Sequence, residues 1–315
     1  MGRSMTGKKI ICISVDLDAL ACYYGLYGLP APSSLQTAHY TKGLKRFLEL
    51  FEEMGLRATL FAVGSDLEDQ ACRGLLGEAA AAGHEAASHT WSHPYDLTRL
   101  APGRIRDEVR RAQAAIEEAA GSRPRGFRAP GYHMSDTVVA VLEEEGYLYD
   151  ASLLPSPPYY LAKSAVILLS LLRGRASRSI IGGPGMVLSP AGPFRTGHRY
   201  WRRGGRLLEI PCSVATPLRI PYIGTTITLS SAGTLGLLER SIRRRDLVSL
   251  ELHAIDMMDA RGDGFEDLLP HQVDARVPLD EKREKIRGAL ARLTGPMGFE
   301  PMTLAQAAEA LSITV

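Results

Sequence analysis

The chain has 315 residues, a length that suits one large α/β domain with a sizeable buried core. Apolar residues make up 45% and charged residues 23%, which excludes a mainly disordered protein. The 37 basic and 35 acidic side chains give a formal net charge of +2, so the overall charge does not favour a nucleic-acid partner. We therefore expect no nucleic acid among its ligands.

The cysteines favour a reducing compartment. None of the four belongs to a CxxC pair; they are Cys12, Cys22, Cys72 and Cys212. Cysteines this sparse in a chain of this length predict small core side chains rather than a disulfide framework. The apolar run near the N-terminus is short and is interrupted at once by Asp16 and Asp18, unlike a signal peptide. These features predict a cytoplasmic protein.

Strand and helix patterns alternate along the first 150 residues. Alternating or β-branched runs predict strands at 8–15, 58–63, 84–89 and 125–129. Helical periodicity predicts helices at 42–54, 68–82, 104–120 and 135–145, each followed by a glycine and the last with Ser135 as its N-cap. Repeated strand–helix units of this length predict parallel strands joined by crossover helices, hence an α/β barrel or an open sheet.

The alternation breaks between residues 153 and 206, a stretch rich in proline and glycine with one apolar segment at 159–172. It resumes with strands at 206–212 and 247–251 and helices at 232–245 and 279–293, before 301–311 closes the chain. No internal repeat or linker is evident. We expect a single domain, 1–315, with an insertion at about 153–206 that covers the active site.

Asp16 and Asp18 follow the first predicted strand. Side chains two residues apart on a strand point the same way, so the two carboxylates project from one place. The C-terminal ends of barrel strands are where active sites gather. The alternative is a turn or a helix cap, for which aspartate is also common.

His89 and His93 follow the third predicted strand, within the sequence SHTWSH. Two histidines four residues apart can face one ion, and imidazoles with a carboxylate suit zinc or a related divalent cation. Two ordinary surface histidines are the alternative.

Arg128 and His253 also come directly after predicted strands. A guanidinium there can hold a carboxylate in place, although a surface salt bridge is an alternative. A histidine titrates near neutral pH and can serve as a general acid, although a buried, hydrogen-bonded histidine is an alternative. All these residues follow strands, so we expect them to gather on one face of the barrel.

In this order, the residues resemble the five motifs of the polysaccharide deacetylase family, the NodB-like carbohydrate esterases of family four. The motifs correspond to residues 15–18 (VDLD), 88–93 (SHTWSH), 128–132 (RAPGY), 149–152 (YDAS) and 252–253 (LH).

The resemblance implies a distorted (β/α) barrel that removes an acyl group, acetyl or formyl, from an amino sugar. One divalent metal is implied, with zinc as the first choice and cobalt, nickel or manganese as alternatives. The implied metal ligands are Asp18, His89 and His93. The resemblance further implies Asp16 as general base, His253 as general acid, Arg128 orienting Asp16, Asp150 supporting this pair, and Gly131 and Tyr132 stabilising the oxyanion, Tyr132 through its backbone N–H.

One departure from the family pattern is that Leu17 separates the two aspartates, which are usually adjacent. This spacing resembles a subgroup with intracellular peptidoglycan-deacetylase-like and allantoinase-like proteins. It leaves open which aspartate is base and which is ligand. It also keeps two other functions open: hydrolysis of a small non-sugar amide such as a ureide, and a catalytically silent sugar-binding module.

Clustered arginines follow the apolar segment 159–172. They include Arg173, Arg175 and Arg178, with further arginines between 195 and 206. The segment is too short to span a bilayer, but an apolar helix beside basic residues can lie at a membrane interface. Arginine also suits phosphate, so we hypothesise a lipid-linked or nucleotide-linked amino sugar and peripheral association with the inner face of the membrane. A core helix followed by a solvated basic loop is the alternative.

Overall fold

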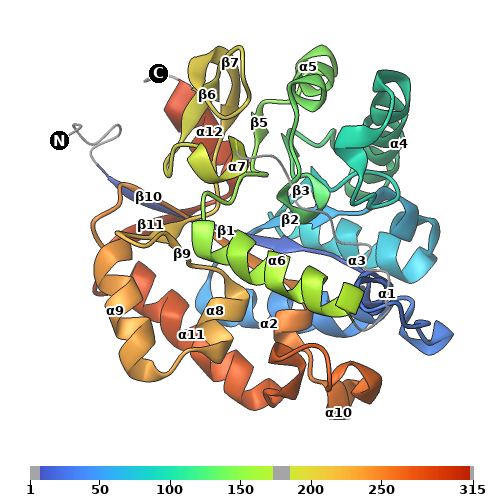
Figure 1. The fold of residues 1–315 in the computed structure, drawn as a ribbon, viewed down its shortest axis with the longest axis vertical. Helices are drawn as coiled ribbons and strands as arrows, with labels where there is room; N and C mark the ends of the chain where they lie inside the picture. The colour runs from blue at the N-terminus through green and yellow to red at the C-terminus, as the bar shows by residue number, and fades with distance from the viewer. Residues whose placement is uncertain (1–7, 173–184, 313–315) are drawn as a thin grey trace.

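A curled, mainly parallel β-sheet forms the centre of the molecule. The structure is a computed structural model that describes residues 8–172 and 185–312; Arg173, Arg175 and Arg178 lie outside these ranges. Nine strands pair in the order β10-β1-β2-β3-β4-β5-β7-β6, and β11 pairs with β1. Among the described strands of this sheet, only β6 runs antiparallel to its neighbour, β7, and β8 and β9 form a separate antiparallel pair. The fold is therefore the expected α/β class, a partial, distorted barrel (Figure 1).

The element bounds agree closely with the predicted alternation in the first half of the chain. The strands are β1 Lys9–Asp16, β2 Thr59–Ala62, β3 Glu85–Ser88, β4 Gly126–Phe127, β5 Tyr149–Asp150, β6 Phe194–Thr196, β7 Arg203–Glu209, β8 Val214–Ala215, β9 Ile220–Pro221, β10 Leu247–His253 and β11 Phe299–Met302. The helices are α1 Leu20–Leu26, α2 Lys45–Met54, α3 Gln70–Ala81, α4 Pro102–Ala120, α5 Asp136–Glu144, α6 Pro157–Leu172, α7 Gly185–Leu188, α8 Gly224–Leu229, α9 Ala232–Ile242, α10 Ala260–Asp263, α11 Leu279–Thr294 and α12 Leu304–Ser312.

Local sequence explains several helix boundaries. Gly55 ends α2 in the left-handed conformation with φ of 65°, which glycine adopts without strain. Ser135 caps α5 as predicted, because its side chain accepts a hydrogen bond from the Val138 N–H. The helix predicted at 42–54 begins earlier, as a π-helix at His39–Leu44 that continues into α2.

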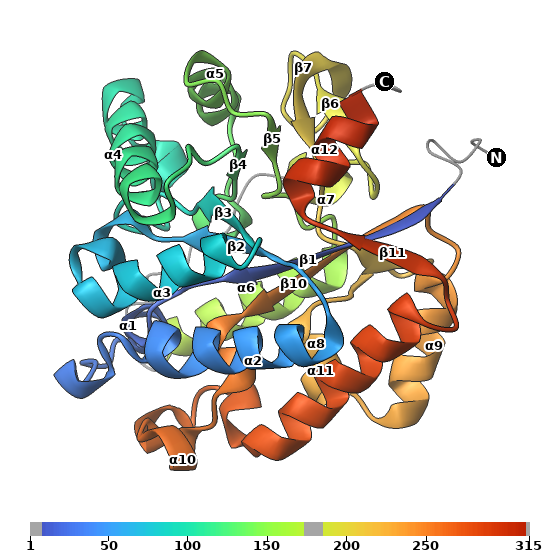
Figure 2. The ribbon, with the colours of Figure 1, turned by 180° about the vertical axis from the view of Figure 1, so that it is seen from behind.

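The largest part of the core lies between the sheet and the helices that cover its outer side, among them α2, α3 and α11 (Figure 2). Strand β1 contributes Ile11, Ile13 and Val15, all fully buried. Because β1 is flanked by β10 on one side and by β11 and then β2 on the other, it is the most deeply embedded strand. Its last residue therefore reaches the strand-end face at a rigid, central position.

Helix α6, from the predicted insertion, crosses the front of the molecule in Figure 1. Within the described ranges, no helix is both long enough and apolar enough to cross a membrane.

Candidate active site

The ends of β1 and β10 bring together two residues that are far apart in the sequence. Asp16 closes β1, His253 closes β10, and the two are paired in the register of these parallel strands. Two residues earlier, Ser14 is paired with Glu251 in the same way. Because side chains two apart share a face, all four project toward one place.

Asp16 is held by Arg128, which follows β4. The guanidinium is fully buried and donates to Asp16 Oδ1 at 2.5 Å and to Ser14 Oγ at 3.0 Å, while its Nε donates to the Ala151 carbonyl oxygen at 2.8 Å. Burial disfavours the charged guanidinium, but the Asp16 carboxylate raises the pKa of Arg128 above its ordinary value. The carboxylate is thus fixed in position beside a permanent positive charge.

The His253 imidazole faces two carboxylates. Its Nε2 lies 3.7 Å from Glu251 Oε1 and 3.9 Å from Asp16 Oδ2. Burial alone would lower the pKa of His253, but Glu251 and then Asp16 raise it to about 9. The imidazole therefore carries a proton at neutral pH, as a general acid must.

Glu251 is a site residue that the sequence analysis missed. It is fully buried, and its Oε2 accepts a hydrogen bond from the Tyr132 hydroxyl at 2.9 Å. Burial and the neighbouring Asp16 raise the pKa of Glu251 to about 7. Glu251 lies two residues before His253 on one strand. The same spacing of two polar residues at a strand end drew attention to Asp16 and Asp18, so it could have identified Glu251 as well.

Asp18, His89 and His93 form a second cluster beside the first. The two histidine Nε2 atoms lie 3.2 and 3.3 Å from Asp18 Oδ1, and the three side chains are buried. The Nδ1 of His89 is 2.7 Å from the Arg128 carbonyl oxygen, so Nδ1 must carry the proton and the Nε2 lone pair faces the cluster.

The donor set of this cluster fits a divalent cation. Asp18 Oδ1 and His93 Nε2 are buried and have no hydrogen-bond partner within residues 8–172 and 185–312. Burying such atoms without partners is costly, and an ion bound between them would remove that cost. One carboxylate with two imidazoles is typical of zinc and related ions.

Cys22 departs from the expectation that all four cysteines lie in the core. The thiols of Cys12, Cys72 and Cys212 are buried, whereas Cys22 in α1 is partly exposed. Its Sγ lies 3.5 Å from His93 Nδ1, on the side of the ring away from Asp18. Cys22 therefore helps to orient a candidate metal ligand.

One of the predicted roles differs from what the structure shows. The Tyr132 backbone N–H donates to the Ala129 carbonyl oxygen at 3.2 Å, so it is occupied within its own turn rather than available for an oxyanion. The side chain of Tyr132 and the backbone of Gly131 do line the pocket. Asp150 lies outside the pocket lining: it accepts from Ser152 Oγ at 2.5 Å, and burial raises its pKa. Its supporting role stays a prediction.

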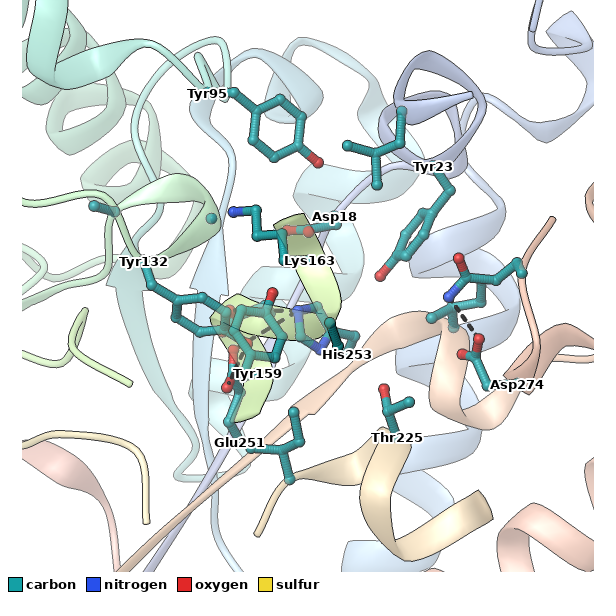
Figure 3. A pocket seen from close by; sticks show the side chains of 18 of the residues that line it. Asp18, Tyr23, Tyr95, Tyr132, Tyr159, Lys163, Thr225, Glu251, His253 and Asp274 are labelled. Carbon is teal, nitrogen blue, oxygen red and sulfur yellow. Dashed lines mark hydrogen bonds and ion pairs between the residues drawn. The ribbon is translucent and has the colours of Figure 1, made fainter. Parts of the chain in front are cut away.

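One pocket of about 330 Å³ is lined by Asp16, Asp18, His89, Glu251 and His253. Figure 3 shows Glu251 and His253 on its floor, with Tyr23, Tyr95, Tyr132 and Tyr159 around it. Helix α6 contributes Tyr159, Ala162, Lys163 and Ile167 to the lining.

Comparisons with known proteins find related sequences over part of the chain. The family model described as Polysaccharide deacetylase matches residues 37–149. This part of the chain therefore resembles polysaccharide deacetylases in sequence. The matched part includes His89, His93 and Arg128, whereas Asp16, Asp18 and His253 lie outside it.

A peptidoglycan deacetylase of Helicobacter pylori is 29% identical over 161 residues, which cover 50% of this chain and 54% of that protein. The chain spans about half or less of the length of the curated relatives that it matches. Among solved structures, a protein of Mycobacterium smegmatis assigned as a polysaccharide deacetylase aligns with a TM-score of 0.61 at 20% identity, covering 97% of this chain and 91% of that one. The Puue allantoinase aligns with a TM-score of 0.58 at 16% identity, covering 97% and 90%. At these identities the structural likeness shows the shared fold.

Proposed function

We propose that the protein is a metal-dependent hydrolase that removes an N-acyl group, acetyl or formyl, from an amino sugar. The observation that carries this proposal is the pairing of Asp16, held by Arg128, with His253 across two strand ends, directly beside the Asp18–His89–His93 cluster. A base, an acid and a candidate ion site thus face one pocket.

The side chains divide the work of amide hydrolysis. Asp16 accepts a proton from the attacking water as the water oxygen bonds to the acyl carbon. His253 donates its proton to the amine nitrogen as the carbon–nitrogen bond breaks, which gives a free amine and a carboxylic acid. Arg128 keeps the Asp16 carboxylate in place, and Glu251 favours the protonated form of His253.

Asp18, His89 and His93 would hold the divalent ion, with zinc as our first choice and cobalt, nickel or manganese as alternatives. An ion there would polarise the acyl carbonyl and lower the pKa of a bound water. Because His89 Nδ1 is fixed by the Arg128 carbonyl, this ligand is already oriented.

The first test measures metal and activity together. Elemental mass spectrometry should find about one equivalent of divalent metal in the wild type and a loss of it in the His89→Ala/His93→Ala double variant. Acetate release from N-acetylglucosamine oligomers should fall at least 100-fold in the same variant, and chelation of the wild type should have the same effect.

The exposed His198 supplies a matched control, since His198→Ala should keep both metal and activity. Wild-type protein that binds no zinc, cobalt, nickel or manganese would contradict the proposal and favour a silent binding module. Metal binding with activity on a ureide but on no N-acyl sugar would favour the small-amide alternative.

Lys163 supports a substrate that carries an anionic group, such as a phosphate-linked amino sugar. Its Nζ lies 3.3 Å from His133 Nε2 at the pocket wall, and no carboxylate lies within ion-pair distance in the described part of the chain. Burial lowers the pKa of Lys163 to about 8, so the amine still carries a proton at neutral pH. A substrate anion would supply the missing counter-charge.

Lys163→Met is expected to lower activity selectively on a phosphorylated substrate. Hydrolysis of N-acetylglucosamine 1-phosphate should fall about 10-fold relative to hydrolysis of neutral N-acetylglucosamine, because a charge-assisted hydrogen bond contributes about 1.5–3 kcal/mol. Lys163→Arg should retain most of the preference. Equal losses on both sugars would remove the support for an anionic substrate. The cytoplasmic location stays a prediction.

A further inference from the structure

The wall of the pocket away from Lys163 is built by the segment between α10 and α11. Gln272 and Asp274 from this segment line the pocket, and Asp274 begins a single 3-10 turn, Asp274–Arg276. Both residues lie outside the part of the chain that the family model matches.

Asp274 has a buried oxygen that lacks a partner. The residue is 1% exposed, and its Oδ1 accepts a hydrogen bond from Gln272 Nε2 at 2.5 Å. Its Oδ2 is buried and has no hydrogen-bond partner among the residues that the structure describes. A buried carboxylate oxygen left in this state is costly, so a donor supplied by a ligand would stabilise it.

Two consecutive hydrogen bonds fix the orientation of this carboxylate. The Tyr27 hydroxyl donates to Gln272 Oε1 at 2.9 Å, which turns the amide Nε2 toward Asp274. The Tyr27 ring also stacks on His271 with ring centroids 5.1 Å apart. Asp274 Oδ1 is therefore occupied and Oδ2 is the acceptor that remains, with the carboxylate directed toward the pocket (Figure 3).

The charge of Asp274 is already balanced from behind. The fully buried Lys282 donates through Nζ to the carbonyl oxygens of Ile255 and Met258. Burial lowers the pKa of Lys282, and Asp274 is the acidic group that most strongly opposes this shift. A cationic ligand at Asp274 would meet the repulsion of this ammonium. A neutral donor would satisfy Oδ2 without adding charge.

The remaining polar groups on this side are hydroxyls. Tyr23 and Thr225 line the pocket near Asp274, and Figure 3 shows all three around the same part of the cavity. Burial and nearby carboxylates raise the pKa of Tyr23, so its hydroxyl keeps its proton and can donate. Hydroxyl groups both donate and accept hydrogen bonds, and a carboxylate accepts them. These groups together therefore match a ligand whose own hydroxyls donate and accept hydrogen bonds.

We propose that Asp274, oriented by Gln272, binds ring hydroxyls of the substrate and forms a sugar-hydroxyl subsite with Tyr23 and Thr225. The inference rests on the proposed function and narrows it, because a ureide or another small amide has no vicinal hydroxyls for this wall. The opposite side of the pocket, with Lys163, would then contact the anionic group of the substrate.

Two acetyl donors test the subsite: N,N′-diacetylchitobiose, which carries ring hydroxyls, and 4-nitrophenyl acetate, which carries none. In the metal-loaded protein, Asp274→Asn should raise KM for diacetylchitobiose about 10- to 100-fold, since a hydrogen bond to a charged group is lost. Its kcat for diacetylchitobiose and its rate on 4-nitrophenyl acetate should change less than about 3-fold. Asp267→Asn, an exposed carboxylate of the same segment, is the matched control and should leave all values unchanged.

Each outcome separates the subsite from the proposed function. An unchanged KM for diacetylchitobiose in Asp274→Asn would overturn the subsite and leave the hydrolase intact. A parallel loss on both substrates together with a lower Tm would mean that Asp274 only supports Lys282, and would also overturn it. Wild-type protein inactive on both substrates would refute the proposed function itself, and activity on the ester alone would overturn the sugar-hydroxyl subsite.

Discussion

Alternation along single strands is the residue-scale rule that organises this site. Ser14 with Asp16 and Glu251 with His253 are pairs two positions apart, and the register joins the pairs across β1 and β10. Position at the end of a predicted strand singled out Asp16, Asp18 and His253 in the sequence. Which side chain of the neighbouring strand lies next to them depends on the register of strand pairing. Glu251 lies beside His253 because the two are two positions apart on β10, whereas the register of β1 with β10 brings Asp16 to the same imidazole.

Glu251→Gln is expected to change the pH profile of the enzyme. The Glu251 carboxylate is the main group that raises the pKa of His253 to about 9, so its removal lowers that pKa. A general acid with a lower pKa loses its proton at lower pH, so the alkaline limb of kcat/KM should move down by about one unit. The measurement is kcat/KM for acetate release between pH 6 and 10.

Two variants accompany this comparison. Glu266→Gln, an exposed carboxylate in the same half of the chain, should leave the limb in place. Tyr132→Phe removes the hydroxyl that donates to Glu251 but keeps the carboxylate, so the limb should stay near that of the wild type. An alkaline limb that does not move in Glu251→Gln would show that Glu251 does not tune His253.

Helix α6 shows at the element scale what periodicity could and could not predict. The apolar run indicated a helix but not which side of it faces the pocket. In the structure, Tyr159, Lys163 and Ile167 share the spacing of one helical face and line the pocket. Leu161 and Leu168, 73% and 58% exposed, lie on another face. An apolar outer face beside a pocket entrance supports the proposed membrane contact.

A vesicle assay tests this face. Wild-type protein should co-sediment with vesicles of 30% phosphatidylserine in phosphatidylcholine. Leu161→Gln/Leu168→Gln should reduce the bound fraction at least about 5-fold, since full burial of each leucine side chain is worth about 1.5–3 kcal/mol. Leu237→Gln, an exposed leucine on α9, is the control and should bind as the wild type does. Wild-type protein that stays in the supernatant would exclude peripheral association with such membranes.

Other elements differ from their sequence patterns for reasons of packing. The strand predicted at 125–129 keeps only Gly126–Phe127 in the ladder, and a Cβ at Gly126 would lie 2.0 Å from the Tyr149 side chain. Gly43 in the π-helix lies so close to the Ala254 carbonyl oxygen that a Cβ there would sit at 2.7 Å. A single sequence does not show which backbone will approach a glycine.

At the scale of the whole molecule, the strand ends from both halves of the chain meet at one face. The cluster residues Asp18, His89 and His93 follow β1 and β3, Arg128 follows β4, and His253 ends β10. Parallel strands with crossover helices place their C-terminal ends together, so the gathering of these residues follows from the topology. The wall with Gln272 and Asp274 follows no strand, and no periodic pattern marks it.

The sequence by itself determined the α/β class, most of the elements before residue 150 and the strand-end residues that carry the candidate chemistry. These predictions use local properties: the hydrophobic periodicity, the glycines that end helices, and the position of a residue after a strand. Such properties do not depend on tertiary packing. The tertiary structure decided which distant residues meet in the site: Arg128 with Asp16, Asp16 with His253 and Cys22 with His93. These pairings join residues brought together by register, burial and loop packing, and their energies depend on distances that exist only once the chain is folded.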